Sequence, residues 1–442
     1  MLILLKTLAY NARKHAGFRR YASNTSWLFA EQMIRMLAGL LVGIWVARYL
    51  GPDQFGLFSY VAAFAALFGS IAKLGLDSIV VRDLVRFPEQ RVAYLATAFW
   101  LKIVGAALML CAVAIAMQFT NSDHTTKLYI FIIACGLVFQ AFEVIDFYFQ
   151  SKVLSKFVSI CKLIQLFISS LIKLYLIFSG AGLFWFVMAI FVDQLTLAAT
   201  LYLAYRYQKI DVLFRGFDRS LAKMLIYDSW PLILSGLMIM VYMRIDQIMI
   251  KEMLGNHALG IYSAATRISE VWHFVPVLVT ASIFPSIINA KKASEVNYIN
   301  RIQNILTILV WISIAFILFT FAFGEWLIVA LYGAAFHDAS KVLFIHACGG
   351  IFVTMGVVSG SWYLSEGLQK YVFYRTALAA IINIPLNFIL ISKYGVIGAA
   401  IATVLTQAVA ALFFDLIMKK TRAIFFIKIK SIVIINKGFF NA

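Results

Sequence analysis

The sequence is poor in charge, and that shortage decides the class of protein. Of its 442 residues, 13% are charged and 63% are hydrophobic, whereas soluble globular chains are about 25% charged and about 45–50% apolar. Apolar runs of about 20 residues recur along the whole chain, which is the length that a bilayer-spanning helix requires. The composition therefore predicts a membrane protein with many spans and excludes an ordinary soluble domain.

Residues that support covalent or metal chemistry are also scarce. Each of the four cysteines lies in an apolar run, and no pair of them has metal-ligand or redox spacing. The six histidines show no paired metal spacing, and no Gly-x-x-x-x-Gly-Lys-Ser/Thr phosphate loop is present. We therefore expect no metal, no cofactor, no enzymatic centre and no direct use of ATP.

Hydropathy predicts an all-α integral membrane fold with twelve spans. The segment 325–332 is too short to span and is expected to extend the ninth helix, and the lysine-interrupted run after Met418 is expected to lie at the membrane interface. The predicted spans are 23–48, 54–75, 92–117, 127–149, 157–179, 183–205, 224–250, 257–289, 301–323, 341–364, 371–391 and 396–418.

The positions of lysine and arginine orient the chain in the membrane. The N-terminal segment, the even-numbered connections and the C-terminal tail hold 26 of these residues, and the odd-numbered connections hold five. The positive-inside rule then places both termini in the cytoplasm, and the even number of spans agrees. This topology and anionic lipid headgroups account for the net charge of +18, so no nucleic-acid binding is expected.

A short motif occurs once in each half of the chain. LGPDQFGLFS at 50–59 and LGNHALGIYS at 254–263 are 204 positions apart, and each is expected to form the same tight outward turn between two helices. Weaker matches follow in the same order along the two halves. They pair Ser26-Trp27 with Ser229-Trp230, 149–157 with 364–372, and 182–194 with 395–407.

The repeat predicts two six-helix lobes related by a pseudo-two-fold axis along the membrane normal, with a site between them that opens alternately to each side. The N-terminal segment is expected either to lie at the interface as an amphipathic helix or to be a disordered basic tail. The expected parts are the segment 1–22, the N-lobe 23–205, a cytoplasmic linker 206–223, the C-lobe 224–418 and a basic tail 419–442.

Four basic residues fall deep inside the predicted spans: Arg35, Lys102, Arg244 and Arg267. Each such charge costs about 2.5–3.5 kcal/mol at the bilayer centre on insertion scales, so it usually faces a cavity or a partner. A cavity lined with these bases would favour an anionic solute such as a phosphate or a uronic acid. Guanidinium suits phosphate because it can donate two parallel hydrogen bonds.

Acidic residues lie among these bases, and two interpretations of them stay open. Glu31 lies four residues from Arg35, and Arg267 lies three residues from Glu270, so each pair can neutralise itself on one helix face. Alternatively, a carboxylate among the bases binds a coupling proton or cation.

Two further carboxylates and two prolines complete the candidates. Asp246 is two residues from Arg244 and so points to another side of the helix, and Asp193 lies mid-span, where an interhelical hydrogen bond is the alternative role. Pro276 and Pro385 lie inside spans, where proline removes a backbone hydrogen bond. A static kink and a hinge are equally compatible with these two positions.

A resemblance to a known family is carried by the run RYLGPDQFGLFSYVAAFAALFGSIAKLGLDSIVVRDLVR at 48–86. It resembles the signature region of O-antigen and polysaccharide flippases of the multidrug/oligosaccharidyl-lipid/polysaccharide exporter superfamily. The segments at 244–270 and 394–407 give similar support, and the resemblance covers about residues 20 to 420. It implies a twelve-helix, two-lobe protein of the bacterial inner membrane that moves an undecaprenyl-pyrophosphate-linked oligosaccharide to the periplasmic leaflet.

The resemblance also implies a cationic central cavity, coupling to an ion gradient, and partners. The lipid-linked oligosaccharide and membrane lipids are expected to bind, and a polysaccharide polymerase and a chain-length regulator are the expected protein partners. Four positions match the basic residues of such a cavity: Arg35, Lys102, Arg244 and Arg267. Arg82 and Arg86 match basic residues of the signature region on the cytoplasmic side. Asp246 matches an acidic residue of the family.

Two other functions remain as alternatives. A drug exporter of the same superfamily should prefer an acidic cavity, whereas the deep bases here match or outnumber the deep acids. A membrane glycan polymerase usually carries its catalytic residues on a large periplasmic loop, and the longest outward connection here, near 118–126, is only about ten residues. No motif in the sequence identifies the sugar.

Overall fold

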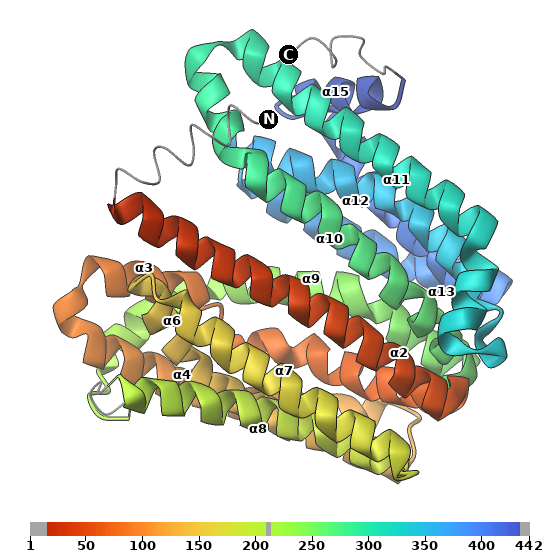
Figure 1. Ribbon diagram of the computed structural model, residues 1–442, viewed down its shortest axis with the longest axis horizontal. Coiled ribbons are helices and arrows are strands. Elements are labelled where there is room, and N and C mark those ends of the chain that lie inside the picture. The colour runs from red at the N-terminus through yellow and green to blue at the C-terminus, as the bar shows by residue number, and fades with distance from the viewer. Residues whose placement is uncertain (1–15, 209–213, 434–442) are drawn as a thin grey trace. The chain divides into compact units, whose positions relative to one another are not determined.

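The computed structural model describes residues 16–208 and 214–433, and these residues are almost entirely helical (Figure 1). No strand occurs among them, which confirms the predicted all-α class. Residues 1–15, 209–213 and 434–442 lie outside the described residues, together with the predictions made for those parts of the N-terminal segment, the linker and the basic tail.

The helices vary in length from one turn to more than ten turns, because several long ones join two predicted segments. They are α2 (Ala16–Lys73), α3 (Asp77–Arg86), α4 (Arg91–Ala116), α5 (His124–Leu137), α6 (Val144–Ser151), α7 (Ser155–Phe178), α8 (Leu183–Tyr207), α9 (Arg219–Leu254), α10 (Asn256–Ala293), α11 (Glu295–Tyr332), α12 (Ala339–Ser365), α13 (Lys370–Ala408), α14 (Phe414–Ile417) and α15 (Arg422–Val433). Short 3-10 segments lie at Pro88–Gln90, Met117–Phe119, Val138–Glu143 and Ala334–Phe336, and a π-helical turn lies at Val409–Phe413.

The predicted spans correspond to these helical segments. Nine helical runs among the described residues are long and apolar enough to cross a membrane, and two of them, Ser26–Arg86 and Lys370–Ile417, each contain two predicted spans. The predicted eighth span lies in α10. As expected, 325–332 extends the ninth predicted helix, because α11 runs to Tyr332.

Glycines break the long helices at the connections that hydropathy predicts. Gly51 has φ 69° and ψ 171° inside α2, and Gly395 has φ 59° and ψ −138° inside α13. Gly255, which precedes α10, has φ 91° and ψ −178°. Such torsions strain any residue with a Cβ. Gly51 and Gly255 are the matching glycines of the repeated motif, and they adopt the same conformation.

A second matched turn supports the duplication through its hydrogen bonds. The turns at 151–154 and 365–368 have the same backbone pattern at an offset of 214 residues, with Val153 (φ 57°) in the place of Gly367 (φ 68°). Each turn has three backbone hydrogen bonds, and each bond in the first turn has its equivalent in the second. In the first turn the amides of Lys152, Val153 and Leu154 donate to the carbonyls of Tyr148, Gln150 and Phe149, in that order. In the second turn the amides of Glu366, Gly367 and Leu368 donate to the carbonyls of Trp362, Leu364 and Tyr363, in that order.

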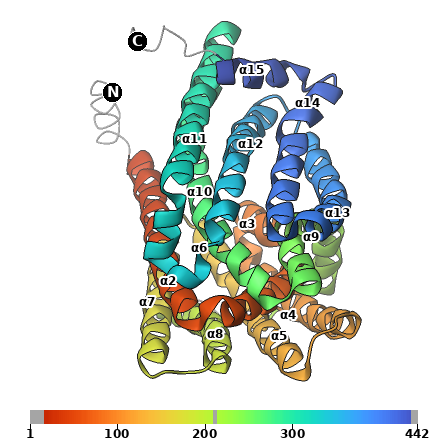
Figure 2. The same ribbon diagram turned by 90° about the vertical axis from the view of Figure 1, so that its right-hand side faces the viewer.

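The chain divides into two compact units, one of residues 1–43 and 64–237 and the other of residues 44–63 and 238–442. The first has a buried core contributed by α3, α4, α6, α7, α8 and the start of α9, and α7 and α8 lie side by side in it (Figure 1). The second has a core contributed by α10, α11, α12 and α15 and by the π-helical turn, and α15 packs against α11 (Figure 2). The predicted lobe boundaries stay a prediction.

The matched turns generate a test of backbone strain. The left-handed conformation costs an L-residue about 1–2 kcal/mol, so Gly367→Val should lower the free energy of unfolding by about that amount. Val153→Gly should be neutral or slightly stabilising, because relief of this strain opposes the added backbone entropy of glycine. Val104→Gly, in the exposed face of α4, should cost about 1 kcal/mol. Thermal unfolding in detergent measures all three, and equal losses at 153 and 104 would contradict the strain.

Candidate functional site

A buried carboxylate, Asp246 of α9, is the centre of the polar groups in the second unit. The hydroxyl of Tyr262, on α10, donates to Asp246 Oδ2, and the backbone amide of Gln247 donates to Oδ1 at 2.8 Å. The Tyr262 hydroxyl also lies 3.4 Å from Thr403 Oγ1 on α13. Three helices therefore meet at one carboxylate, and no base within ion-pair distance neutralises it among the described residues.

Two buried asparagines follow on α13, on either side of Pro385. Asn387 Nδ2 donates at 3.0 Å to both the backbone carbonyl and the side-chain oxygen of Asn383, and Asn383 Nδ2 donates to Thr406 Oγ1 at 3.3 Å. These oxygens suit a hard cation rather than a transition metal. No group of three or more His, Cys, Asp or Glu side chains that could hold a metal ion occurs in the described part of the chain.

The predicted hinge prolines do not interrupt their helices. Pro276 lies inside α10 and Pro385 inside α13, and the non-helical torsions of α13 are at Gly395 instead. Glycine breaks the helix there because φ 59° combined with ψ −138° is a conformation that residues with a Cβ rarely adopt. The hinge role of the two prolines stays a prediction.

Arg244 and Arg267 have partners that the spacing did not predict. Arg244 Nη1 lies 3.9 Å from Glu270 Oε1, so Glu270 pairs across helices rather than with Arg267 on its own helix. The guanidinium of Arg267 lies 4.8 Å from the centroid of the Phe55 ring, and such a desolvated cation–π contact contributes about 2 kcal/mol. Of the two interpretations left open, neutralisation by Glu270 therefore does not describe Arg267, because a tertiary contact places an aromatic ring against its guanidinium.

In the first unit, the predicted deep bases are neutralised. Arg35 Nε lies 3.0 Å from Glu31 Oε1, which is the pair that their spacing allows. Lys102 is 1% exposed, with Nζ 3.1 Å from Glu143 Oε2 and 3.9 Å from Asp77 Oδ1. A base held by two carboxylates inside a core favours a packing role for Lys102 over the cavity role that was predicted.

Asp193 and the two signature arginines are also paired or stacked. Lys173 on α7 donates to Asp193 on α8 at 2.7 Å, so the interhelical alternative describes this carboxylate. Arg82 is 56% exposed and contacts both oxygens of its neighbour Asp83 at 2.7 and 3.2 Å. Arg86 lies over the ring of the next residue, Phe87, at 5.3 Å. Arg82 Nη2 also lies 3.3 Å from Asp228 Oδ2, so two carboxylates hold this arginine.

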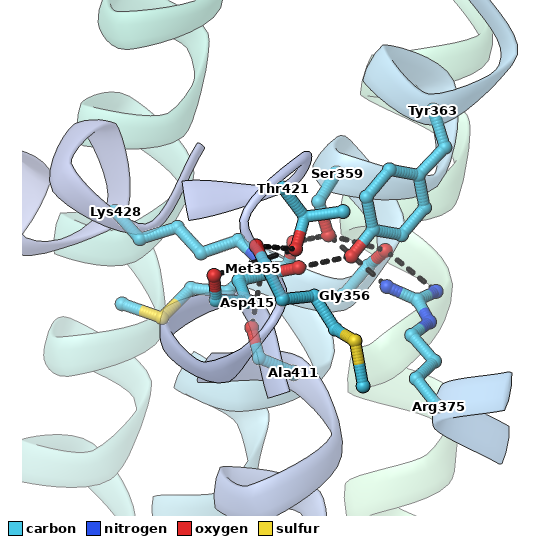
Figure 3. Close-up of polar contacts among 10 residues, drawn as sticks. Met355, Gly356, Ser359, Tyr363, Arg375, Ala411, Asp415, Thr421 and Lys428 are labelled. Carbon is cyan, nitrogen blue, oxygen red and sulfur yellow. Dashed lines mark hydrogen bonds and ion pairs between the residues drawn. The ribbon is translucent and has the colours of Figure 1, made fainter. Parts of the chain in front are cut away.

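The structure adds Arg375, which lies near the start of the predicted span 371–391. Its Nη1 donates to Ser359 Oγ at 3.1 Å, its Nη2 donates to the Gly356 carbonyl at 3.0 Å, and its guanidinium lies 5.3 Å from the Tyr363 ring (Figure 3). Arg375 also lines a pocket of about 200 Å³. The pocket is lined by Tyr242, Phe352, Val353, Gly356, Val357, Arg375, Thr376, Ala379, Gln407, Ala410 and Ala411.

A buried ion pair lies beside this arginine and attaches α15 to the membrane helices. Lys428 Nζ donates to Asp415 Oδ2 at 2.5 Å and to the Ala411 carbonyl, in the π-helical turn, at 2.6 Å (Figure 3). Tyr363 donates its hydroxyl to the other carboxylate oxygen. Burial lowers the pKa of Lys428 to about 8. Sequence patterns had indicated only an interfacial tail, because a lysine in a basic run is normally solvated.

The two copies of the repeated motif pack against each other within the second unit. A Cβ on Gly56 would lie 1.8 Å from the Asn256 carbonyl oxygen, and a Cβ on Gly260 would lie 1.9 Å from that of Pro52. These two contacts are the same contact under the 204-residue offset. The side chains of the equivalent residues Asp53 and His257 meet at 3.1 Å. The reciprocal contact shows that a local two-fold relation joins the two turns.

Comparisons with known proteins agree with this architecture. The family described as polysaccharide biosynthesis protein matches residues 21–291, and the MatE family matches residues 231–389. A capsular polysaccharide biosynthesis protein, CapF, of Staphylococcus aureus is 22% identical over 88% of this chain and 96% of its own length. A probable flippase, AglR, of Haloferax volcanii is 25% identical over 87% of this chain and 80% of its own length.

Two solved structures show the same fold. An inward-facing multidrug resistance MATE transporter aligns with a TM-score of 0.70 at 16% identity, covering 92% of this chain and 99% of that one. The lipid II flippase MurJ, in an inward closed conformation, aligns with a TM-score of 0.68 at 17% identity, covering 91% of this chain and 90% of that one.

The paired glycines generate a prediction about the turn contact. Gly56→Ala and Gly260→Ala should each lower the free energy of unfolding by about 1–3 kcal/mol, because the new methyl group meets a backbone carbonyl that cannot rotate away. Gly39→Ala in α2 is the matched control, since nothing lies within 4 Å of a Cβ there, and it should be neutral or stabilising. Thermal unfolding of the purified variants measures this, and three equal midpoints would rule out the close contact.

Proposed function

Because the chain belongs to the polysaccharide biosynthesis protein family, we propose that it is a flippase that moves lipid-linked oligosaccharide units across the cytoplasmic membrane. The observation that carries this proposal is the family match over residues 21–291, which includes the resemblance region 48–86. The chain is a membrane transporter in fold, and its relatives are named for polysaccharide biosynthesis and as probable flippases.

The proposed substrate is an undecaprenyl-pyrophosphate-linked repeat unit of an O-antigen or a related surface polysaccharide. Pyrophosphate needs cations when it leaves water, and arginine can donate two parallel hydrogen bonds to a phosphate group. Arg244 and Arg267 lie inside predicted spans, held by a long ion pair and by an aromatic ring. Such weakly neutralised guanidiniums can exchange their partners for a phosphate at low cost.

The proposed movement is alternating access between the two sides of the membrane. The protein would load the glycan at the cytoplasmic leaflet and release it at the periplasmic leaflet, with both of its own termini cytoplasmic. It breaks and forms no covalent bond in this scheme. A polysaccharide polymerase and a chain-length regulator would act on the released units.

Asp246 is the proposed site of ion coupling. Its carboxylate is buried and bound by neutral donors from two directions, so a proton or a small cation would change the charge of this site. Tyr262 and Thr403 would transmit that change to α10 and α13, because both share the hydrogen-bonded cluster.

A second candidate function is supported by the MatE match at 231–389 and by the multidrug transporter fold. An exporter of cationic drugs would need an acidic binding surface. In the second unit Asp246, Glu270 and Asp415 lie among the arginines, so the deep charges are of both signs. Arg267 contacts an aromatic ring and Arg375 donates to neutral oxygens, so we favour the anionic glycan over a cationic drug.

Deletion of the gene in its own host tests the proposal. Undecaprenyl-linked repeat units should accumulate on the cytoplasmic side, and surface glycan should fall. In the complemented strain, Arg244→Ala and Arg267→Ala should each reduce surface glycan about tenfold or more through loss of a charge-assisted contact. Lys393→Ala, at an exposed outward position, should restore it fully.

Accumulation of single units on the periplasmic side of the deletion strain would reject the flippase role, because it indicates a polymerase. Full surface glycan in both arginine variants, with normal amounts of each in the membrane, would reject the cavity role of Arg244 and Arg267.

Asp246→Asn tests the coupling role separately. The amide keeps the size and most hydrogen bonds of the carboxylate but cannot carry its charge, so transport in proteoliposomes should lose its dependence on an imposed proton or sodium gradient. Asp338→Asn is the control, because Asp338 is exposed and paired only with nearby surface residues. An unchanged gradient dependence in Asp246→Asn would reject the assignment.

A further inference from the structure

Arg375 places a positive charge in the wall of the pocket, and no carboxylate of the described residues forms an ion pair with it. Two further charged side chains, Lys428 and Asp415, lie beside it outside the pocket lining and are bound to each other at 2.5 Å. Among the described residues, Arg375 donates to neutral oxygens, those of Ser359 and Gly356. The cluster therefore carries a net charge of about +1 in surroundings that favour neutrality.

The walls of this pocket combine apolar surface with unused hydrogen-bonding capacity. Phe352, Val353 and Val357 line it together with the side chain of Gln407, whose amide oxygen has no hydrogen-bond partner among the described residues. Gln407 is buried in space that Gly349 leaves open, since a Cβ there would lie 2.2 Å from the amide oxygen. That oxygen packs against Gly349, and the polar part of the pocket lining comes from the side chains of Tyr242, Thr376 and Gln407.

These features together describe the ligand chemically. The arginine favours an anion, the polar side chains of Tyr242, Thr376 and Gln407 suit hydroxyl groups, and the apolar wall suits the C–H face of a small ring or a glycerol chain. We propose that this pocket binds an anionic group that also carries hydroxyls, of the kind present in an acidic sugar or in a glycerophosphate headgroup. The volume of about 200 Å³ suits one such group.

The position of the pocket connects it with Asp246. Tyr242 lines the pocket and lies one helical turn before Asp246 on the same face of α9. Gln407 lies one turn after Thr403, which contacts Tyr262 in the Asp246 cluster. Polar side chains therefore lie between the pocket and the buried Asp246 carboxylate on one face of α9 and on one face of α13.

A further row of side chains on α13 runs from the pocket toward the buried asparagines. Arg375, Ala379 and Asn383 recur every four residues along α13, and Asn383 bonds to Thr406. Arg375 lies in the second turn of α13, at the end that the charge distribution predicts to be cytoplasmic. The ligand would therefore enter from the side on which, under the proposed function, the glycan is loaded.

Binding to the purified full-length protein tests this inference without requiring transport. The protein is reconstituted in phosphatidylcholine nanodiscs and titrated with glucuronate, glucose 1-phosphate, neutral glucose and acetate. The two hydroxyl-bearing anions should bind, and glucose and acetate should bind much more weakly. Arg375→Gln should weaken binding about tenfold or more, and Gln407→Leu about threefold to tenfold, through the lost hydrogen bonds.

Two variants serve as controls in the same titration. Lys370→Gln removes an exposed cation from the first turn of the same helix and should bind like the wild type. Arg375→Lys keeps the charge but loses the two-pronged geometry, so it should bind with intermediate affinity. The unliganded unfolding midpoint of each variant establishes that it is folded.

A parallel arm with phosphatidylglycerol nanodiscs separates the two sources of the ligand. If phosphatidylglycerol raises the unfolding midpoint in an Arg375-dependent way and the sugars do not bind, the glycerophosphate headgroup is the ligand of the proposed class. If no hydroxyl-bearing anion binds, or if Arg375→Gln binds all of them like the wild type, the inference is overturned. That result would leave the flippase proposal intact, because the gene-deletion phenotype tests it independently.

Discussion

The high free energy of an unpaired charge in a lipid environment is the constraint on which the rest of this structure depends. In the first unit the constraint is met by pairs: Lys102 with Glu143 and Lys173 with Asp193. Each pair joins two different helical segments, so the charges hold these segments together. In the second unit Arg267 contacts an aromatic ring and Arg375 donates to neutral oxygens, and the proposed anionic ligand rests on these two contacts.

The same constraint explains why the second unit is rich in neutral polar side chains. Asp246 is held by a hydroxyl and a backbone amide, and Asn383 by a threonine. Neutral partners leave a carboxylate able to change its charge state, which a strong ion pair would prevent. The polar groups of α9 and α10 meet those of α13 at Thr403, and the proposed ion coupling rests on this contact.

The backbone conformation of the repeated motif is the same in both halves of the chain, as a duplication would produce. Gly51 and Gly255 adopt the same positive-φ conformation, and the reciprocal contacts of Gly56 and Gly260 bring the two motif copies together. Only glycine allows a carbonyl to approach this closely. The motif that indicates the repeat in the sequence is thus also where the two copies contact each other. The contact lies at the turns that precede the second predicted span of each half.

The sequence alone determined the class of protein, the helical segments and the repeat, because hydrophobic runs, glycine breaks and charge distribution are local properties of the chain. It also indicated the Glu31–Arg35 pair, whose partners share one helix face. Only the tertiary structure decided that Glu270 pairs with Arg244 and that Lys428 is buried against Asp415. It also placed Arg375 beside a pocket. Spacing along one helix cannot reveal which other helix lies opposite, and that neighbour decides whether a charge is neutralised or left for a ligand.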